Sequence, residues 1–204
     1  MAPADQGKKL VKKISKMPNG FQHFNIIPEN CETIDGEQLA LHFPWATHLE
    51  TVTRDWVGNL FIRNMKAMYE MSKDGFDAQL KDRELFATTS RYIVITKASD
   101  KWAHIAYLHY RIDMDNGIPV AYIYELQIEP EYQRKGIGSI LVGLVEKLSS
   151  RAGLTKIMAT VFAFNSRSLT FFHKQGFQAD ETCPNEDADV DYLILSKQTP
   201  YLLA

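Results

Sequence analysis

The chain has 204 residues, of which 45% are hydrophobic and 24% are charged. This length and composition suffice for one domain with a sizeable core. A formal net charge of −2 excludes a protein that is basic throughout and holds nucleic acid by bulk charge. The two cysteines, Cys31 and Cys183, argue against a disulfide scaffold and suit a reducing compartment.

The charge is divided between two opposed segments. Residues 1–16 hold five lysines against one aspartate, a net charge of +4, and are expected to form a solvated, frayed arm. Residues 178–196 hold six acidic and no basic side chains. The sequence has no apolar run long enough to span a membrane and no signal peptide, so we expect an intracellular protein without a membrane partner.

The first half of the chain passes from irregular structure to helices and then to strands. Closely spaced Pro, Asn and Gly residues over 17–44 predict irregular structure with a short strand at 24–27. Apolar spacing predicts a helix from about residue 53 to 73, and a second, charged helix over 77–85. Strands rich in β-branched and aromatic residues follow at 91–96, 102–112 and 119–128, joined by turns as in a meander.

The second half of the chain alternates helices with strands. Residues 137–148 carry apolar side chains at helical spacing, and Gly153 ends that helix. A buried strand over 157–164, a short helix over Ser166–Lys174 and a last strand over 192–195 follow. This order behind an antiparallel meander predicts an α/β fold with a mixed sheet.

The most informative motif is a glycine turn that joins the strand ending at Ile128 to the helix beginning near Ile137. Gly136 and Gly138 let a ligand approach the backbone, and the free amides of the helix start favour an anion such as pyrophosphate. The turn lacks the lysine of a Walker loop and the third glycine of a Rossmann loop. Taken alone, it is equally consistent with a glycine-assisted loop.

Two signatures together carry a family resemblance. Gln133-x-x-Gly136-x-Gly138 fits the Q/R-x-x-G-x-G/A motif of the GCN5-related N-acetyltransferases, and Asn165-x-x-Ser168-x-x-x-Phe172-x-x-x-Gly176-Phe177 resembles the second signature of that family. The resemblance covers roughly residues 90–198. It implies the GNAT fold, with two splayed central strands, and acetyl-CoA as acetyl donor without a metal.

The resemblance also assigns a set of cofactor contacts. It implies that the glycine turn holds the pyrophosphate, that the strand before it pairs with the pantetheine arm, and that an asparagine lies beyond the second strand. The residues at these positions are Leu126, Gln127, Ile128, Arg134, Lys135, Gly136, Ile137, Gly138, Ser139 and Asn165. Many relatives have a tyrosine at the Phe172 position that protonates the departing thiolate, so that role falls elsewhere here, or to water.

Acetyl transfer to an amine needs a proton acceptor beside the thioester. Glu125 is the best candidate, because it lies in the strand next to the expected thioester position; the alternative is an ordinary carboxylate on a half-exposed strand. In a regular strand Tyr122 and Tyr124 share one face and Glu125 lies on the other. A bulge would turn either the tyrosines or Glu125 to the opposite face. The acidic segments near this strand favour a cationic acceptor such as a basic peptide.

Within the superfamily, the chain is similar to the N-alpha-acetyltransferase D family, which acetylates the N-terminus of histones beginning Ser-Gly-Arg-Gly. Met68-Tyr69-Glu70, the stretch from Arg111 to Asp115, and Tyr122-x-Tyr124-Glu125-x-Gln127 carry this likeness. It implies Glu125 as catalytic base, with Tyr122 and Tyr124 beside the reacting amine. The remaining substrate contacts that it implies are Tyr69, Asp113, Asp115, Thr160 and Tyr192.

The sequence thus predicts a basic arm and irregular segment over 1–52, an acetyltransferase domain over 53–198 and a tail over 199–204. We expect a monomeric enzyme of nucleus and cytoplasm that acts on a histone peptide and has no direct nucleic-acid site. Asp74 replaces a family tryptophan, and the acidic connection 178–190 is short, which leaves peptide selectivity open. The alternatives are a lysine or small-amine acetyltransferase of the same fold, and a non-catalytic acyl-CoA-binding module.

Overall fold

A seven-stranded mixed sheet forms the centre of the computed structural model, which describes residues 3–185 and 187–199. Within these residues the strand order is β1-β2-β3-β4-β5-β7-β6, and the β4–β5 pair is parallel while the other pairs are antiparallel. The strands are β1 (Leu39–His42), β2 (Arg91–Lys97), β3 (Asp100–Asp115), β4 (Ile118–Ile128), β5 (Lys156–Phe162), β6 (Gln178–Ala179) and β7 (Tyr192–Gln198). The helices are α1 (Pro3–Ile14), α2 (Gly20–His23), α3 (Thr51–Met71), α4 (Ala78–Leu85), α5 (Ile137–Ala152) and α6 (Ser166–Lys174), with short 3-10 turns at Ala46–His48 and Pro130–Tyr132.

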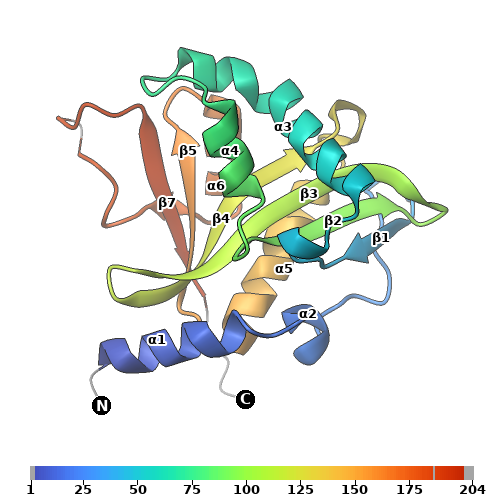
Figure 1. Cartoon of the computed structure of the whole chain (residues 1–204), viewed down its shortest axis with the longest axis horizontal. Helices are drawn as coiled ribbons and strands as arrows, with labels where there is room; N and C mark the ends of the chain where they lie inside the picture. The colour runs from blue at the N-terminus through green and yellow to red at the C-terminus, as the bar shows by residue number, and fades with distance from the viewer. Residues whose placement is uncertain (1–2, 186, 200–204) are drawn as a thin grey trace.

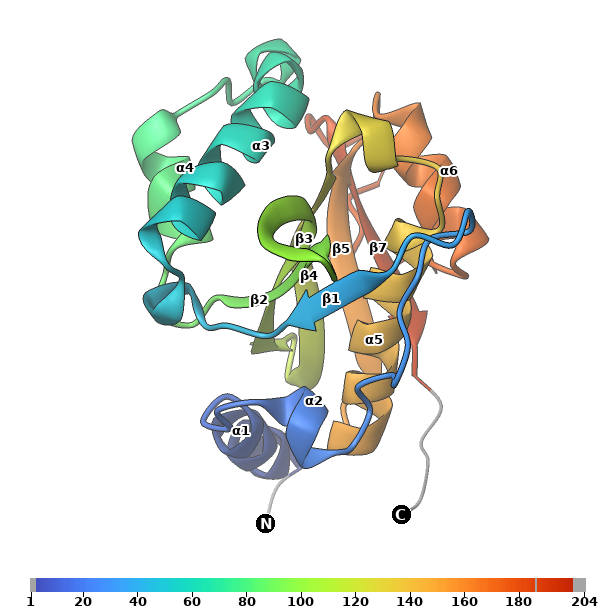
Figure 2. The same cartoon turned by 90° about the vertical axis from the view of Figure 1, so that its right-hand side faces the viewer.

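Helices cover both faces of the sheet, as the two views in Figures 1 and 2 show. On one face, α3 packs over Tyr92, Val94 and Tyr107 in a small apolar cluster. On the other face, α5 contributes more residues to the larger core than any other helix, and α1, α2 and α6 also pack there. The mixed α/β architecture predicted from the order of the elements is confirmed.

Local signals in the sequence set the ends of the predicted helices. Asp77 caps α4, because its carboxylate accepts from the amides of Gln79 and Leu80. Helix α5 begins after Gly136 and ends before Gly153, both of which have a left-handed backbone. The predicted helices and the strands of the meander are therefore confirmed, with bounds that differ by a few residues.

The N-terminal region differs from the sequence expectation. The expected frayed arm is helix α1, whose Ile14 is buried in the main core and whose Leu10 and Val11 pack against it. The strand expected at 24–27 is absent; residues 20–23 form α2, and the strand of this region is β1 further along the chain. Leu10, Val11 and Ile14 lie at helical spacing, and the sequence analysis overlooked this apolar stripe among the lysines that surround it.

A β-bulge interrupts β4 at the place where the sheet opens. His109 of β3 pairs with Glu125, but the next residue of β3, Tyr110, pairs with Ile123, so Tyr124 is the extra residue. Strand β4 pairs with β5 only over Val120–Ile123, and the two strands part beyond it. The bulge and the splay therefore coincide, and the edge of β4 after the bulge is turned toward the gap.

Among the described residues, no helix combines the length and the apolar character that crossing a membrane requires. The tail expected over 199–204 lies outside the described residues except for Thr199. The proposed boundary between residues 52 and 53 stays a prediction.

Candidate active site

The bulge places the three predicted catalytic residues on one face of the sheet. Residues paired across neighbouring strands share a face, and Glu125 is paired with His109 while Tyr122 is paired with Arg111. Tyr124 also lies on this face, because its ring stacks on that of His109 at 5.1 Å between centroids. Regular alternation would have separated Glu125 from the two tyrosines. The expectation that a bulge would re-aim one set is confirmed.

Glu125 is a buried carboxylate held by two side chains. It is 5% exposed, and Lys81 of α4 donates from Nζ to its Oε1 at 2.9 Å. Gln127 donates from Nε2 to the other oxygen at 2.8 Å. Burial raises the pKa of Glu125, and the Lys81 ammonium and the Gln127 amide oppose that rise by stabilising the carboxylate. The reading of Glu125 as a carboxylate on a half-exposed strand is therefore wrong.

Lys81 is a component of this site that the sequence analysis missed. Its ammonium also lies 2.5 Å from Glu84, and it stands over the rings of Phe61 and Tyr69, each at 4.8 Å. Burial lowers the pKa of Lys81, but Glu125, Tyr69 and Glu84 together outweigh that effect and raise it. A signal was present in the sequence: Lys81 lies four residues before the apolar Leu85, on the inward side of a short charged helix.

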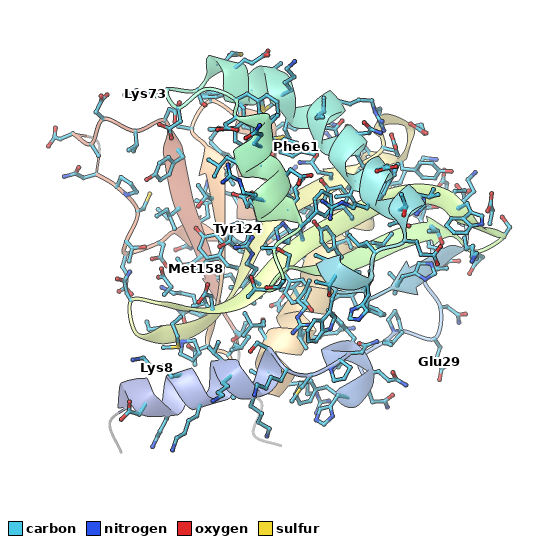
Figure 3. The ribbon with its side chains drawn as sticks, viewed as in Figure 1. Lys8, Glu29, Phe61, Lys73, Tyr124 and Met158 are labelled. Atoms are coloured by element: carbon cyan, nitrogen blue, oxygen red, sulfur yellow. The ribbon has the colours of Figure 1, made fainter. Side chains whose placement is uncertain are left out.

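Tyr122 and Tyr124 are held in the floor of the site. The hydroxyl of Tyr122 is hydrogen-bonded to Oγ1 of Thr160 at 2.5 Å, which bridges β4 to β5 just where the strands part. Burial raises the pKa of Tyr122. Tyr124 lies below α4 in Figure 3 and is sandwiched between the His109 ring and the Arg111 guanidinium, the latter 4.3 Å from its centroid.

Aromatic side chains form the wall opposite Glu125. Tyr69 of α3 makes an edge contact with Phe162 of β5 at 5.0 Å, and Tyr192 of β7 is the strand partner of Phe162. Burial raises the pKa of Tyr69 to about 12, so its hydroxyl is protonated and a donor at neutral pH. Three elements thus bring the predicted substrate residues Tyr69, Thr160 and Tyr192 to one face, beside the catalytic candidates.

The predicted acidic residues do not all reach the site. Asp115, at the end of β3, is close enough to Tyr122 to raise the pKa of that hydroxyl. Asp113 is exposed, and its carboxylate accepts from the neighbouring amide of Met114. The structure therefore associates Asp115 with the site, whereas the substrate contact of Asp113 stays a prediction.

Ion pairs and a hydrogen bond engage several carboxylates of the acidic segment 178–196, which was expected to favour a cationic acceptor. Asp180 is buried against Lys156 at 2.9 Å. Asp189 is paired with the Lys73 ammonium, and Asp191 accepts from the Lys73 amide at 2.7 Å. Glu186 lies outside the described residues. The segment therefore carries less unpaired charge than its composition implied. The expectation that it favours a cationic acceptor is corrected in part.

The two contacts of Lys73, one ion pair and one hydrogen bond, join two loops. Lys73 belongs to the loop between α3 and α4, and the two aspartates belong to the connection between β6 and β7 (Figures 1 and 3). Lys73 and Asp189 are largely exposed, so the pair is weak, but the amide of Lys73 adds a backbone anchor to Asp191. This link draws the two loops together over the aromatic wall.

The glycine turn has the geometry of an anion cradle. Arg134 and Gly136 both have positive φ, at 66° and 85°, and turn the backbone sharply into α5. The first amides of α5 have no acceptor within the helix, and the helix dipole favours a negative group there. Gln133 fixes this arrangement, because its side chain donates to the carbonyl of Ile128 at 3.0 Å. The turn is thus rigidly attached to the end of β4.

Other predicted cofactor residues already have partners within the chain. Lys135 is paired with Asp35 at 2.8 Å, in a loop that the sequence analysis left irregular. Ser139 accepts from Gln175 of α6 at 3.0 Å. Asn165 caps α6 by accepting from the Ser168 amide at 3.1 Å. These contacts account for the fold, and the cofactor roles of these residues stay predictions.

Phe172, which replaces a tyrosine present in many relatives, belongs to the core. It is 6% exposed and packs edge-on against Phe171 and Phe177. The ring has no proton to donate. The residue that protonates a leaving group must therefore come from the face that carries Tyr122, Tyr124 and Glu125, or be a water molecule.

Comparison with known proteins decides the family. The profile described as the acetyltransferase (GNAT) family matches residues 49–177. The chain belongs to the GNAT acetyltransferase family. Both signatures of the sequence analysis lie within that match, and the fold expected from them is confirmed.

Individual relatives are more distant. The spermidine N(1)-acetyltransferase of Thermoplasma acidophilum is 32% identical over 62 residues, which are 30% of this chain and 38% of that protein. The structure of PaiA N-acetyltransferase from the same organism, in complex with coenzyme A, has 18% identity and a TM-score of 0.56, covering 78% of this chain and 99% of that one. Arabidopsis thaliana Naa50, in complex with a CoA–peptide bisubstrate analogue, has 16% identity and a TM-score of 0.54, covering 78% and 97%. The curated relative therefore matches over little more than a third of its own length, and the two structures support the fold.

The residues of this GNAT protein fit acetyl-CoA. The splay leaves the edge of β4 over Leu126–Ile128 without a β5 partner, which suits the pantetheine amides, although the Ile128 carbonyl already accepts from Gln133 and Asn64. The cradle of the glycine turn follows this edge directly. The group would supply a thioester carbonyl at the opening between β4 and β5. Within residues 3–185 and 187–199, no group of three His, Cys, Asp or Glu side chains is arranged to hold a metal ion.

Proposed function

We propose that this GNAT acetyltransferase transfers acetyl from acetyl-CoA to the N-terminal α-amine of a protein, and that its substrates are histone tails beginning Ser-Gly-Arg-Gly. The observation that carries the proposal is the bulge in β4, which presents Tyr122, Tyr124 and Glu125 together at the opening of the strands. The sequence likeness to the N-alpha-acetyltransferase D family at these three positions supports it.

The proton balance favours Glu125 as general base. The neutral amine forms a bond to the thioester carbonyl carbon, the C–S bond breaks, and the thiolate leaves. The amine loses a proton in this exchange, and Glu125 accepts it, directly or through one water molecule. An α-amine has a pKa near 8, against about 10.4 for lysine, so more of it is neutral at physiological pH. The raised pKa of Glu125 makes it a stronger base than an exposed carboxylate.

The side chains on the acceptor side support a cationic substrate. Tyr69 packs edge-on against Phe162, and Lys73 links the loop before α4 to the connection between β6 and β7. Asp115 near Tyr122 suits the positive charge of the amine or of the substrate arginine.

A second candidate is acetylation of a small polyamine. The match to a spermidine N(1)-acetyltransferase favours it, since that relative is 32% identical over 62 residues. Polyamines are cationic, so the same Asp115 would suit them as well. Localisation in nucleus and cytoplasm, and a monomeric state, are part of the proposal and follow from the histone substrate and from the family resemblance.

The experiment compares products and substrates with purified full-length protein. A Ser-Gly-Arg-Gly peptide, the same peptide with a blocked N-terminus and an internal lysine, and spermidine are each incubated with acetyl-CoA. Mass spectrometry of the peptides then locates the acetyl group. Exclusive α-acetylation of the free peptide supports the proposal, and faster turnover of spermidine or of the lysine would refute it. Absence of turnover with all three would favour the acyl-CoA-binding module.

The base is tested by Glu125→Gln, with Glu70→Gln as matched control. Glu70 is an exposed glutamate of α3 whose partner is a surface lysine. We expect Glu125→Gln to lower kcat by about 100-fold or more, since general-base catalysis contributes 10²–10⁴-fold. Coenzyme A affinity should change by less than about twofold, because the Glu125 side chain is bonded to Lys81 of α4 and not to the glycine turn. Wild-type kcat in Glu125→Gln would remove the base assignment.

A further inference from the structure

The unexpected feature of the site is a line of three alternating charges that runs inward from helix α4. The Lys81 ammonium lies between two carboxylates, 2.5 Å from Glu84 and 2.9 Å from Glu125. The side chain of Lys81 is 8% exposed and that of Glu125 5%, whereas Glu84 is 34% exposed and reaches the surface. The line therefore connects a solvated carboxylate to the buried carboxylate proposed as base.

Apolar and aromatic groups surround the buried end of this line. Lys81 stands over the rings of Phe61 and Tyr69, which exclude water from its stem and from its outer side. In such surroundings an isolated carboxylate protonates instead of remaining charged. Glu125 thus needs a fixed cation close by if it is to begin the reaction ionised.

Lys81 is the cation placed to do this. The titratable and charged groups that face Glu125 are Lys81 and Glu84 from α4, Tyr69 from α3, Tyr92 from β2, and Tyr107, His109 and Arg111 from β3. The tyrosines have raised pKa values, largely through burial, and are neutral. Burial and the neighbouring Arg111 and Lys81 lower the pKa of His109, which is also neutral. Arg111 is engaged elsewhere, with the Glu84 carbonyl and the Tyr124 ring.

We propose that Lys81 is a positioning residue of the acetyl transfer: its buried ammonium, fixed by Glu84, keeps the Glu125 carboxylate ionised and turned toward the tyrosines of the acceptor site. This inference rests on the proposed role of Glu125 as base. Lys81 does not itself need to touch the substrate. Its effect on the reaction passes through the protonation state and the orientation of Glu125.

The direction of the effect follows from the charges. Glu125 works as a base only when it is ionised, and removing a cation 2.9 Å away raises its pKa further. Loss of an opposite charge at this distance typically raises a carboxyl pKa by about 1 to 3 units. At a pH below the new pKa, each unit reduces the ionised fraction, and hence the rate, about tenfold.

The experiment measures kcat/KM against pH for wild type, Lys81→Met, Lys81→Arg and the control Lys147→Met. Methionine keeps the length of the side chain without the charge, and Lys147 is an exposed lysine of α5 on the far side of the sheet. The α-amine of the peptide imposes one protonation on every profile. In Lys81→Met the second protonation, that of Glu125, is expected at a pH higher by 1 unit or more, with the rate recovering at high pH. Lys81→Arg should restore the wild-type profile in large part, and Lys147→Met should match wild type.

A double variant separates this role from a structural one. If Lys81 acts through Glu125, adding Lys81→Met to Glu125→Gln lowers kcat no further than Glu125→Gln alone. The double variant replaces both charged side chains with neutral ones, so it leaves no buried, unpaired carboxylate at position 125. We therefore expect the double variant to fold even if Lys81→Met alone does not. A pH profile of Lys81→Met that matches wild type, a profile of Lys81→Arg shifted as far as that of Lys81→Met, or a further loss of tenfold or more in the double variant would overturn the proposal. Wild-type activity of Glu125→Gln would instead overturn the proposed base.

Discussion

The ion pair between Lys156 and Asp180 provides the sharpest test of how the acidic segment is held. Lys156 begins β5 and Asp180 follows β6, and both side chains are 2% exposed. The Lys156 ammonium lies 2.9 Å from one oxygen of Asp180, and the amide and hydroxyl of Thr182 donate to the other at 3.0 and 2.7 Å. The change to make is Asp180→Asn, which leaves the lysine buried without its carboxylate.

The cost follows from the burial of the pair. Removing one partner of a buried ion pair destabilises a protein by about 3–5 kcal/mol, because a charge is left uncompensated in the interior. Glu181 remains 3.7 Å from Lys156 but is 73% exposed, so it replaces Asp180 only in part. We therefore expect about 3 kcal/mol, the lower end of the range. For a domain of this size that corresponds to a fall in Tm of about 6–12 °C.

Burial raises the pKa of Asp180, but the hydrogen bonds from Ser196 and Thr182 and the Lys156 contact together outweigh it and lower the pKa, so the sign of the pH dependence is fixed. A carboxyl with a lowered folded pKa stabilises the protein fully above its unfolded pKa near 3.9. That stability is lost as the pH falls through the lower folded pKa. The difference between wild type and Asp180→Asn should accordingly stay constant between about pH 5 and 7, and shrink below pH 4.

The assay is urea unfolding of wild type, Asp180→Asn, Lys156→Met and the double variant. Replacing both partners removes the uncompensated charge, so the double variant should regain most of the lost free energy of unfolding. The matched control is Lys197→Met, which removes a half-exposed pair with Glu146 at 2.8 Å and should cost less than about 1 kcal/mol. An Asp180→Asn cost no larger than that of the control, or a double variant as unstable as the sum of the two single ones, would refute the reasoning.

Two further predictions concern the two ends of the site. Gly136→Ala should weaken coenzyme A binding about tenfold, because a Cβ at φ +85° is strained and would lie 3.1 Å from Ile34. Isothermal titration calorimetry measures the affinity for coenzyme A. The control is Gly143→Ala, because the space around a Cβ at that position is open. Equal affinity of the two variants would contradict this role of the turn. Asp115→Asn should raise the KM of a basic peptide about fivefold, or about 1 kcal/mol, whereas Asp113→Asn should change it by less than twofold. A larger effect of Asp113→Asn in steady-state kinetics would show that the hairpin binds the peptide through its exposed side.

The elements that could be predicted from the sequence are those whose packing surface is visible in the spacing of their own residues. Helix α5 carries enough apolar side chains at helical intervals to identify itself, and β2 to β4 are rich in β-branched and aromatic residues. Helix α1 and strand β1 are different. The apolar stripe of α1 has helical spacing, but it lies among lysines that also suit a solvated arm, and β1 is a four-residue edge strand. The distant segments against which each packs are not recorded in the local sequence.

The candidate site shows the same division at the level of single residues. Glu125 and the two tyrosines could be found from motif and spacing, but the face on which each lies depends on where β4 gains its extra residue. That residue is Tyr124, and it is fixed by His109 and Arg111 of the neighbouring strand. Lys81 reaches Glu125 from a helix 44 positions earlier in the chain.

One consequence of the bulge links the two halves of the site. At this point β4 has one residue more than β3 between paired positions. As a result, Leu126 and Ile128 lie on the core face, while Glu125 and Gln127 face α3 and α4. Without the extra residue, either the base or the tyrosines would point into the apolar core against α5, where a carboxylate has no cation to pair with. The bulge also coincides with the place where β4 leaves β5. A single local irregularity therefore lies at the edge that suits the pantetheine arm, and it places Glu125, the proposed base, on the face of the two tyrosines.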